Sequence, residues 1–134
     1  MKTVKGGSVL VIDDEYGVRI VMQKLLEMKG YEVAVAASGK EGIDKLKAGK
    51  YSLVLLDISM EVMNGIETLK KIREFDSKTL IIMLTGERNE KIAKNCFELG
   101  ANNYIIKPFD LDVFDNALSK AAFLQRKNET PGPA

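Results

Sequence analysis

Residues 8–28 read SVLVIDDEYGVRIVMQKLLEM, and this stretch decides the fold. Its first five residues are almost wholly apolar, which is typical of a strand that is buried on both faces. After two aspartates, apolar residues recur at the spacing of a helix, namely Val18, Val21, Met22, Leu25 and Leu26. A strand followed by a helix is the repeating unit of α/β proteins.

The same unit recurs four more times. Apolar or β-branched runs lie at residues 32–36, 52–56, 80–84 and 103–106. Helical stripes follow them, at Ile43 and Leu46, at Ile66, Leu69 and Ile72, at Ile92, Ala93, Cys96 and Phe97, and at Val113, Phe114, Ala117, Leu118 and Ala121. We therefore expect a flavodoxin-like (βα)5 three-layer sandwich, with a parallel five-stranded sheet of order 2-1-3-4-5.

Residues that typically end or cap helices support this division into strands and helices. Gly30, Gly49 and Gly100 each follow a helical stripe, where a left-handed residue ends a helix at little cost. Asp110 is placed to cap the last helix. We predict one domain over residues 1–124, and a polar tail or the start of a linker over residues 125–134.

Composition excludes several classes of function. The 134 residues contain no His, which rules out a Ser-His-Asp triad, a His-bound zinc and a phosphohistidine of the chain's own. The single Cys96 cannot form an internal disulfide, and no apolar run is long enough to span a membrane. With a net charge of +1 we expect no direct nucleic-acid binding. These features predict a soluble, cytoplasmic protein without a membrane partner.

Chemically active side chains follow the strands. Asp13 and Asp14 come after the first strand, Asp57 after the third, Thr85 after the fourth and Lys107 after the fifth. The carboxyl ends of parallel strands meet at one edge, so these groups should converge there. Carboxylates without His or Cys select a hard cation such as Mg²⁺. An aspartate beside Mg²⁺ and a lysine is suited to accept a phosphoryl group.

Over residues 8–124 the chain resembles the receiver domain of two-component response regulators. The likeness rests on four segments in order: Asp13-Asp14, Asp57 in the run LLDISM (55–60) with MNG (63–65), Thr85-Gly86, and Lys107-Pro108-Phe109. Each segment alone is weak, but all four fall on the expected strand ends.

The resemblance implies a role for each position. Asp57 is the phosphoryl acceptor, and Asp14, Asp57 and the backbone carbonyl of Ser59 are ligands of Mg²⁺. Asp13 acts mainly through metal-bound water, and Lys107 faces the phosphoryl oxygens. The resemblance also raises the frequency expected for a cis Lys107-Pro108 peptide bond.

The same resemblance implies a conformational switch. Thr85 moves toward the phosphoryl group, and the aromatic ring of Tyr104 follows. The change alters the surface of the fourth helix, fifth strand and fifth helix that partners bind.

The resemblance also implies partners. Because the chain has no His, the phosphoryl group comes from another protein, such as a sensor histidine kinase or a phosphotransfer protein, from another domain of a longer chain, or from a small-molecule donor. The downstream target is another protein or a fused output domain, and a phosphorylation-linked dimer fits the family. We expect a signalling acceptor that catalyses only its own phosphorylation and dephosphorylation.

Two residues depart from the common family pattern, and other functions stay open. Glu61 stands where Pro is frequent and Asn64 where Asp is frequent, which bears on the rigidity of that loop. One alternative is an aspartyl-phosphate hydrolase like the haloacid dehalogenase phosphatases, although Ser59 then occupies the acid/base position. Another is a receiver-like interaction module that is never phosphorylated. A flavin carrier fits least, since the first loop is acidic.

Overall fold

The computed structural model describes residues 7–60, 62–86 and 88–129, in which strands and helices alternate. The strands are β1 (Ser8–Ile12), β2 (Glu32–Ala36), β3 (Leu53–Asp57), β4 (Leu80–Thr85) and β5 (Asn103–Ile106). The helices are α1 (Tyr16–Met28), α2 (Gly39–Ala48), α3 (Gly65–Phe75), α4 (Glu90–Glu98) and α5 (Leu111–Glu129). This is the predicted (βα)5 pattern.

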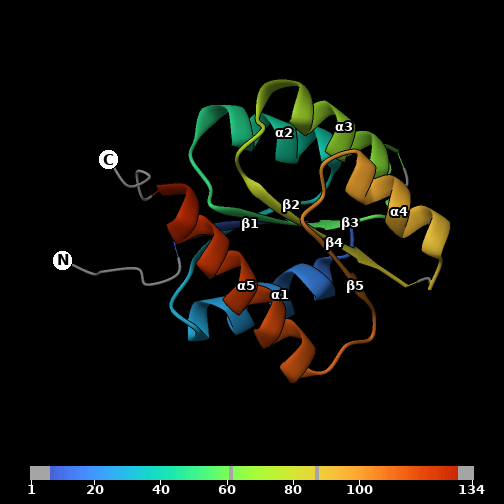
Figure 1. Ribbon diagram of the computed structural model, residues 1–134. Helices are drawn as coiled ribbons and strands as arrows, with labels where there is room; N and C mark the ends of the chain where they lie inside the picture. Colours follow the sequence, from blue (N-terminus) through green and yellow to red (C-terminus); the bar gives the residue numbers. More distant parts are fainter. Residues whose placement is uncertain (1–6, 61, 87, 130–134) are drawn as a thin grey trace.

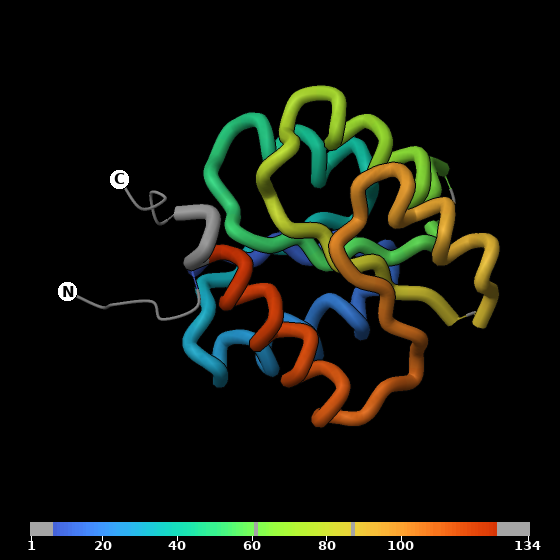
Figure 2. Tube along the Cα trace, in the orientation of Figure 1, coloured from blue at the N-terminus to red at the C-terminus, as the bar shows by residue number. Residues whose placement is uncertain are grey.

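The five strands form one parallel sheet in the order β2-β1-β3-β4-β5, which confirms the predicted topology. Figure 1 shows α2, α3 and α4 on one face of the sheet and α1 and α5 on the other. In Figure 2 the loops that follow β3, β4 and β5 leave the sheet at the same end. The candidate functional residues lie at that end.

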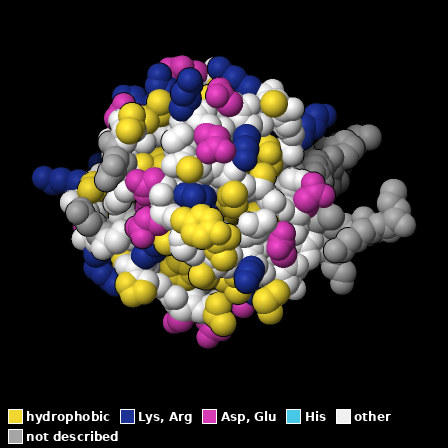
Figure 3. Space-filling model, turned by 180° about the vertical axis from the view of Figure 1, so that it is seen from behind, with side chains coloured by type: hydrophobic (Ala, Val, Ile, Leu, Met, Phe, Trp, Pro, Cys, Tyr) yellow, Lys and Arg dark blue, Asp and Glu magenta, His cyan; other side chains and the backbone are white. Residues whose placement is uncertain are grey.

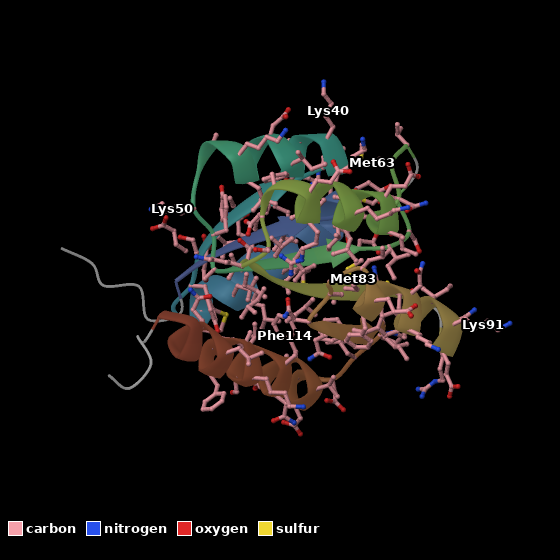
Figure 4. The ribbon with its side chains drawn as sticks, turned by 45° about the horizontal axis from the view of Figure 1, so that its top comes forward. Lys40, Lys50, Met63, Met83, Lys91 and Phe114 are labelled. Carbon is pink, nitrogen blue, oxygen red and sulfur yellow. The ribbon has the colours of Figure 1, made fainter. Side chains whose placement is uncertain are left out.

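Each face of the sheet has its own buried core. Strand residues alternate between the two, so Val11 and Leu55 pack under α1 and α5, whereas Leu10 and Val54 pack under α2 and α3. Figure 4 labels one member of each core, Phe114 on α5 and Met83 on β4, and shows Lys40 pointing into solvent. Because both faces are covered, the central strands are apolar along most of their length.

Two of the predicted strands ended one residue too early. Asp57 and Thr85 were placed after their strands because they are polar, but both are the last residues of strands. Asp57 pairs with Leu84, and Thr85 pairs with Ile106. The third strand also begins at Leu53 rather than at residue 52. A buried strand thus ends in a polar side chain at the edge of the core.

Three apolar stripe residues are more exposed than their spacing predicts. Val21 is 62% exposed, Phe97 48% and Val113 45%. The apolar stripes of α1, α4 and α5 are therefore wider than the surface that these helices bury against the sheet. Cys96, on the same stripe as Phe97, is fully buried in the core as expected.

The predicted helix ends are confirmed with one exception. Gly30 and Gly100 have φ values of 96° and 107°, in the left-handed region that glycine tolerates. Gly49 does not, since its φ of −144° and ψ of −175° are extended, and that prediction was wrong. The Asp110 carboxylate accepts a hydrogen bond from the Val113 N–H, so it caps α5 as predicted.

The fifth helix runs to Glu129, across the boundary that we placed at residue 124, and residues 130–134 lie outside the described part. Within the described ranges no helix has the length and apolar character needed to cross a membrane. Figure 3 shows side chains of both charges scattered among hydrophobic ones on the face seen from behind.

Candidate functional site

Three carboxylates meet at the carboxyl ends of β1 and β3. These strands are neighbours, with Ile12 paired to Leu56, so the residues that follow them come together. Carboxylate oxygens of Asp13, Asp14 and Asp57 lie within 4.8 Å of one another. Asp13 and Asp57 are buried, and Asp14 is accessible to solvent. The predicted convergence is therefore present.

The Asp13 carboxylate is incompletely paired. Its Oδ1 accepts a hydrogen bond of 2.9 Å from the Glu15 N–H, but its Oδ2 is buried and accepts none. Burial raises the pKa of Asp13, and the nearby charge of Asp57 raises it further. A buried carboxylate oxygen that accepts no hydrogen bond and lies beside two other carboxylates fits a hard cation such as Mg²⁺.

Lys107 supplies positive charge from the end of β5. Its Nζ lies 3.2 Å from Oδ1 of Asp57 and 3.8 Å from Oδ2 of Asp13. Its backbone N–H donates to the Thr85 carbonyl at 2.6 Å. The Lys107-Pro108 peptide bond is cis, as the resemblance implies. Lys107 thus contacts both buried aspartates from a backbone anchored to β4.

Short backbone bonds fix the loop after Asp57. The Ile58 N–H donates to the Leu84 carbonyl, and the Gly65 N–H returns to the Ile58 carbonyl, each at 2.9 Å. The Ser59 N–H donates to Oδ1 of Asp57 at 3.3 Å, and the Ser59 side chain is exposed. These bonds place the Ser59 backbone beside Asp57, where the expected metal ligand belongs, but its role as a ligand stays a prediction.

We expect a Gly65→Ala substitution to destabilise this loop. A Cβ at Gly65 would collide with the Asp57 carbonyl oxygen and would lie 2.7 Å from the Ile58 Cα, and neither backbone group can move cheaply. Overpacking of this kind costs about 1–3 kcal/mol of unfolding free energy, which urea denaturation measures. Gly17→Ala in α1 is the matched control, because its Cβ meets nothing within 4 Å. Equal stability of the two variants would contradict the expectation.

The departure at position 64 affects the start of a helix. The Asn64 side chain accepts a hydrogen bond of 2.9 Å from the Glu67 N–H, so it caps α3 as an aspartate would. It therefore acts on the helix start and not on the three carboxylates. The other departure, Glu61, lies outside the described residues.

The two predicted switch residues lie on adjacent strands. Thr85 ends β4 with 2% exposure, and Tyr104 is a half-buried residue of β5 that pairs with Met83. Tyr104 packs against the core under α2, α3 and α4. Their roles as switch residues, and their movement, stay predictions.

Sequence reasoning missed two features beside the site. The first is Arg19, whose Nη1 donates to the Asp13 carbonyl at 2.8 Å. Its position one turn into the helix that follows the aspartates was the available signal. The second is a groove of about 710 Å³ lined by Lys107 and by apolar residues that include Val18, Val21, Leu25, Pro108 and Phe109. No single sequence motif marks the groove, because its two walls come from opposite ends of the chain.

Comparison with known proteins gives a consistent result. The response regulator receiver domain family matches residues 9–119. Sporulation initiation phosphotransferase F of Bacillus subtilis is 34% identical over 112 residues, which cover 84% of this chain and 90% of that protein. Transcriptional regulatory protein YkoG of the same organism is 38% identical over 124 residues, and here the chain spans only 54% of the relative.

Solved structures agree with these matches. A CheY-like receiver domain protein from Methanospirillum hungatei superposes with a TM-score of 0.86 at 29% identity and covers 91% of this chain and 98% of that one. The response regulator TrrA from Thermotoga maritima, in complex with Mg²⁺-BeF, has a TM-score of 0.79 at 31% identity, with coverage of 86% and 98%.

Proposed function

The chain belongs to the response regulator receiver domain family, and from this premise we propose that Asp57 accepts a phosphoryl group from a partner histidine kinase or phosphotransfer protein. One observation carries the proposal: the buried Asp57 carboxylate lies 3.2 Å from the Lys107 ammonium and within 4.8 Å of the carboxylate oxygens of Asp13 and Asp14. Receiver domains are phosphoacceptor signalling domains, and this arrangement suits that chemistry.

In the proposed reaction a carboxylate oxygen of Asp57 attacks the phosphorus of a phosphohistidine. An oxygen–phosphorus bond forms, the phosphorus–nitrogen bond breaks, and the imidazole nitrogen keeps the electron pair and takes up a proton. Lys107 Nζ, already beside Asp57, pairs with the phosphoryl oxygens. The product is an aspartyl phosphate on this chain.

Mg²⁺ is the proposed cofactor. Asp14, Asp57 and the Ser59 carbonyl would hold it directly, and Asp13 through water. When bound, Mg²⁺ neutralises the carboxylates and the incoming phosphoryl oxygens. Oδ2 of Asp13 supports this assignment, because it is buried, accepts no hydrogen bond and has the Lys107 ammonium only at 3.8 Å, so a closer positive charge would stabilise it.

We place the phosphodonor at the apolar groove beside the site. The groove ends at Lys107, which contacts Asp57, and its walls include Val21 and Leu111, which are 62% and 58% exposed. An apolar helix face of a donor protein that fills it would bring a phosphohistidine up to Asp57. The groove is therefore continuous with the chemical site.

The output is a change in the surface formed by α4, β5 and α5. The added phosphoryl charge draws Thr85 toward Asp57, and Tyr104 follows, so the population shifts toward the conformation that a partner or fused output domain binds. The chain spans about half of YkoG, which leaves room for such a domain in a longer protein. A cytoplasmic location completes the proposal and is compatible with the buried free thiol of Cys96.

We expect the unaltered protein to gain one phosphoryl group from acetyl phosphate in the presence of Mg²⁺, as measured by intact mass. Chelation of Mg²⁺ with EDTA should suppress the gain, because the carboxylates then repel the donor. No mass gain with Mg²⁺ present would favour the unphosphorylated interaction module. Rapid turnover of an added phosphomonoester would instead favour the hydrolase.

A further inference from the structure

The junction between β1 and α1 carries Asp13 and Asp14 and immediately precedes the first turn of the helix. Glu15 is the N-cap residue, and its side chain makes no capping hydrogen bond. The first turn of α1 also contains no acidic residue. The side chain of the N-cap residue therefore does not fix the direction of this backbone.

Asp13 is held on both sides of its α-carbon. Its N–H donates to the Ala36 carbonyl of β2 at 3.1 Å, and its C=O accepts from Arg19 Nη1 at 2.8 Å. The first bond continues the pairing of β1 with β2. The second comes from a charged donor, which makes it the stronger kind of hydrogen bond. The Asp13–Asp14 peptide is thus fixed between the sheet and Arg19.

Arg19 is itself well oriented for this contact. Its backbone N–H donates to the Glu15 carbonyl at 3.1 Å in the first turn of α1, and its guanidinium lies 5.7 Å from the centre of the Tyr16 ring. The side chain is half-buried. The contact with Tyr16 and the bond to the Asp13 carbonyl together hold the guanidinium over the junction.

We propose that Arg19 is a positioning residue, whose bond to the Asp13 carbonyl holds the Asp13–Asp14 peptide so that both carboxylates face the cation site. This inference rests on the proposed function. Asp13 is fully buried, and its carboxylate is oriented by the Glu15 N–H at 2.9 Å from Oδ1 and by Lys107 Nζ at 3.8 Å from Oδ2. Both contacts depend on the position of the backbone that carries the carboxylate. A change in that backbone would misplace a carboxylate that binds the cation through water.

The direction of the change in Mg²⁺ affinity on loss of Arg19 distinguishes a positioning role from a purely electrostatic one. A positive guanidinium near a divalent cation repels it, so removal of the Arg19 charge alone would tighten Mg²⁺ binding. Loss of the hydrogen bond to the Asp13 carbonyl would weaken binding, because the two carboxylates would no longer be held together. A purely structural role would lower stability and leave the affinity of the folded protein unchanged.

The test compares Arg19→Met with Lys24→Met in a titration with Mg²⁺ alone, followed by NMR chemical shifts without a phosphodonor. Both variants remove one positive charge from α1, but Lys24 is exposed to solvent. We expect about five- to tenfold weaker Mg²⁺ binding in Arg19→Met and unchanged binding in Lys24→Met. Arg19→Lys keeps a charged donor without the planar guanidinium, and it should lie between the unaltered protein and Arg19→Met.

Equal or tighter Mg²⁺ binding in Arg19→Met would overturn the inference. If Arg19→Met fails to fold, the Mg²⁺ affinity of Arg19→Lys is the test, and equal or tighter binding in that variant would overturn the inference. If the unaltered protein binds Mg²⁺ but takes up no phosphoryl group, the proposed function fails and the Arg19 comparison still stands. If it takes up the phosphoryl group while Arg19→Met binds Mg²⁺ normally, only the Arg19 inference fails. An unaltered protein that binds no Mg²⁺ contradicts both.

Discussion

An Asp57→Asn variant takes up no phosphoryl group from acetyl phosphate and Mg²⁺ under conditions that modify the unaltered protein. An amide oxygen is a far weaker nucleophile than a carboxylate, and asparagine also removes one of the three carboxylates that would hold the cation. Asparagine has nearly the same shape as aspartate, so the buried position next to Lys107 stays filled. Intact mass should show complete loss of the modification.

Asp44→Asn is the matched control, because it makes the same substitution at an exposed position of α2. It should be modified as fully as the unaltered protein. Persistent modification of Asp57→Asn would show that another side chain is the acceptor. Peptide mass mapping would then locate the modified residue, with Asp13 and Asp14 as the nearest carboxylates.

The sequence could predict which side chains meet at the site, because the strand order of the sheet alone brings them together. Once β1 and β3 are neighbours in a parallel sheet, Asp13 and Asp14 after β1 and Asp57 at the end of β3 must meet at one edge. Lys107 joins them from the end of β5. This argument needs only the strand order and the position of each residue after its strand.

Contacts between side chains and backbone could not be predicted in the same way. The position of Arg19 one turn after the aspartates brings it near them, but the sequence does not show that it donates to the Asp13 carbonyl, because that contact depends on the side-chain rotamer. Gly49 follows a helix as Gly30 does, yet its backbone is extended where that of Gly30 is left-handed. Sequence position alone does not distinguish these two helix ends.

The ends of the central strands show a related limit. Periodicity assigns residues by polarity, so Asp57 and Thr85 were read as loop residues. In the structure each continues the sheet for one more residue, since Leu84 and Ile106 pair with them. The polar side chain that marks the site is therefore held by a strand, which gives it a more rigid backbone than a loop would.

In the absence of Mg²⁺ we expect Asp13→Asn to stabilise the protein by about 1–3 kcal/mol of unfolding free energy. Asp13 is fully buried, and its Oδ2 accepts no hydrogen bond. Burial, followed by the charge of Asp57, disfavours its ionised form and raises its pKa. Asparagine keeps an oxygen for the Glu15 N–H and removes the buried charge. Urea denaturation in EDTA measures the gain.

The pH dependence of this gain fixes its cause. Because the pKa of Asp13 is higher in the folded state than the ordinary value of 3.8, the folded protein binds the proton more tightly than the unfolded chain does. The loss of unfolding free energy caused by the buried, ionised Asp13 carboxylate is therefore present at neutral pH. It disappears as the pH falls through the raised pKa toward 3.8, because the carboxylate becomes protonated. The stability difference between Asp13→Asn and the unaltered protein should narrow over that range. A difference independent of pH would mean that packing, and not the buried charge, is responsible.

Added Mg²⁺ should reverse the order of stability of Asp13→Asn and the unaltered protein. A ligand that binds only the folded state stabilises it in proportion to its affinity, and the unaltered protein keeps all three carboxylates. Loss of a group that holds the metal through water costs about 10–100-fold in affinity, so Asp13→Asn should gain much less stability from added Mg²⁺. The same buried oxygen then destabilises the protein without the cation and holds the cation through water when it is present. Equal stabilisation of both proteins by Mg²⁺ would remove Asp13 from the site.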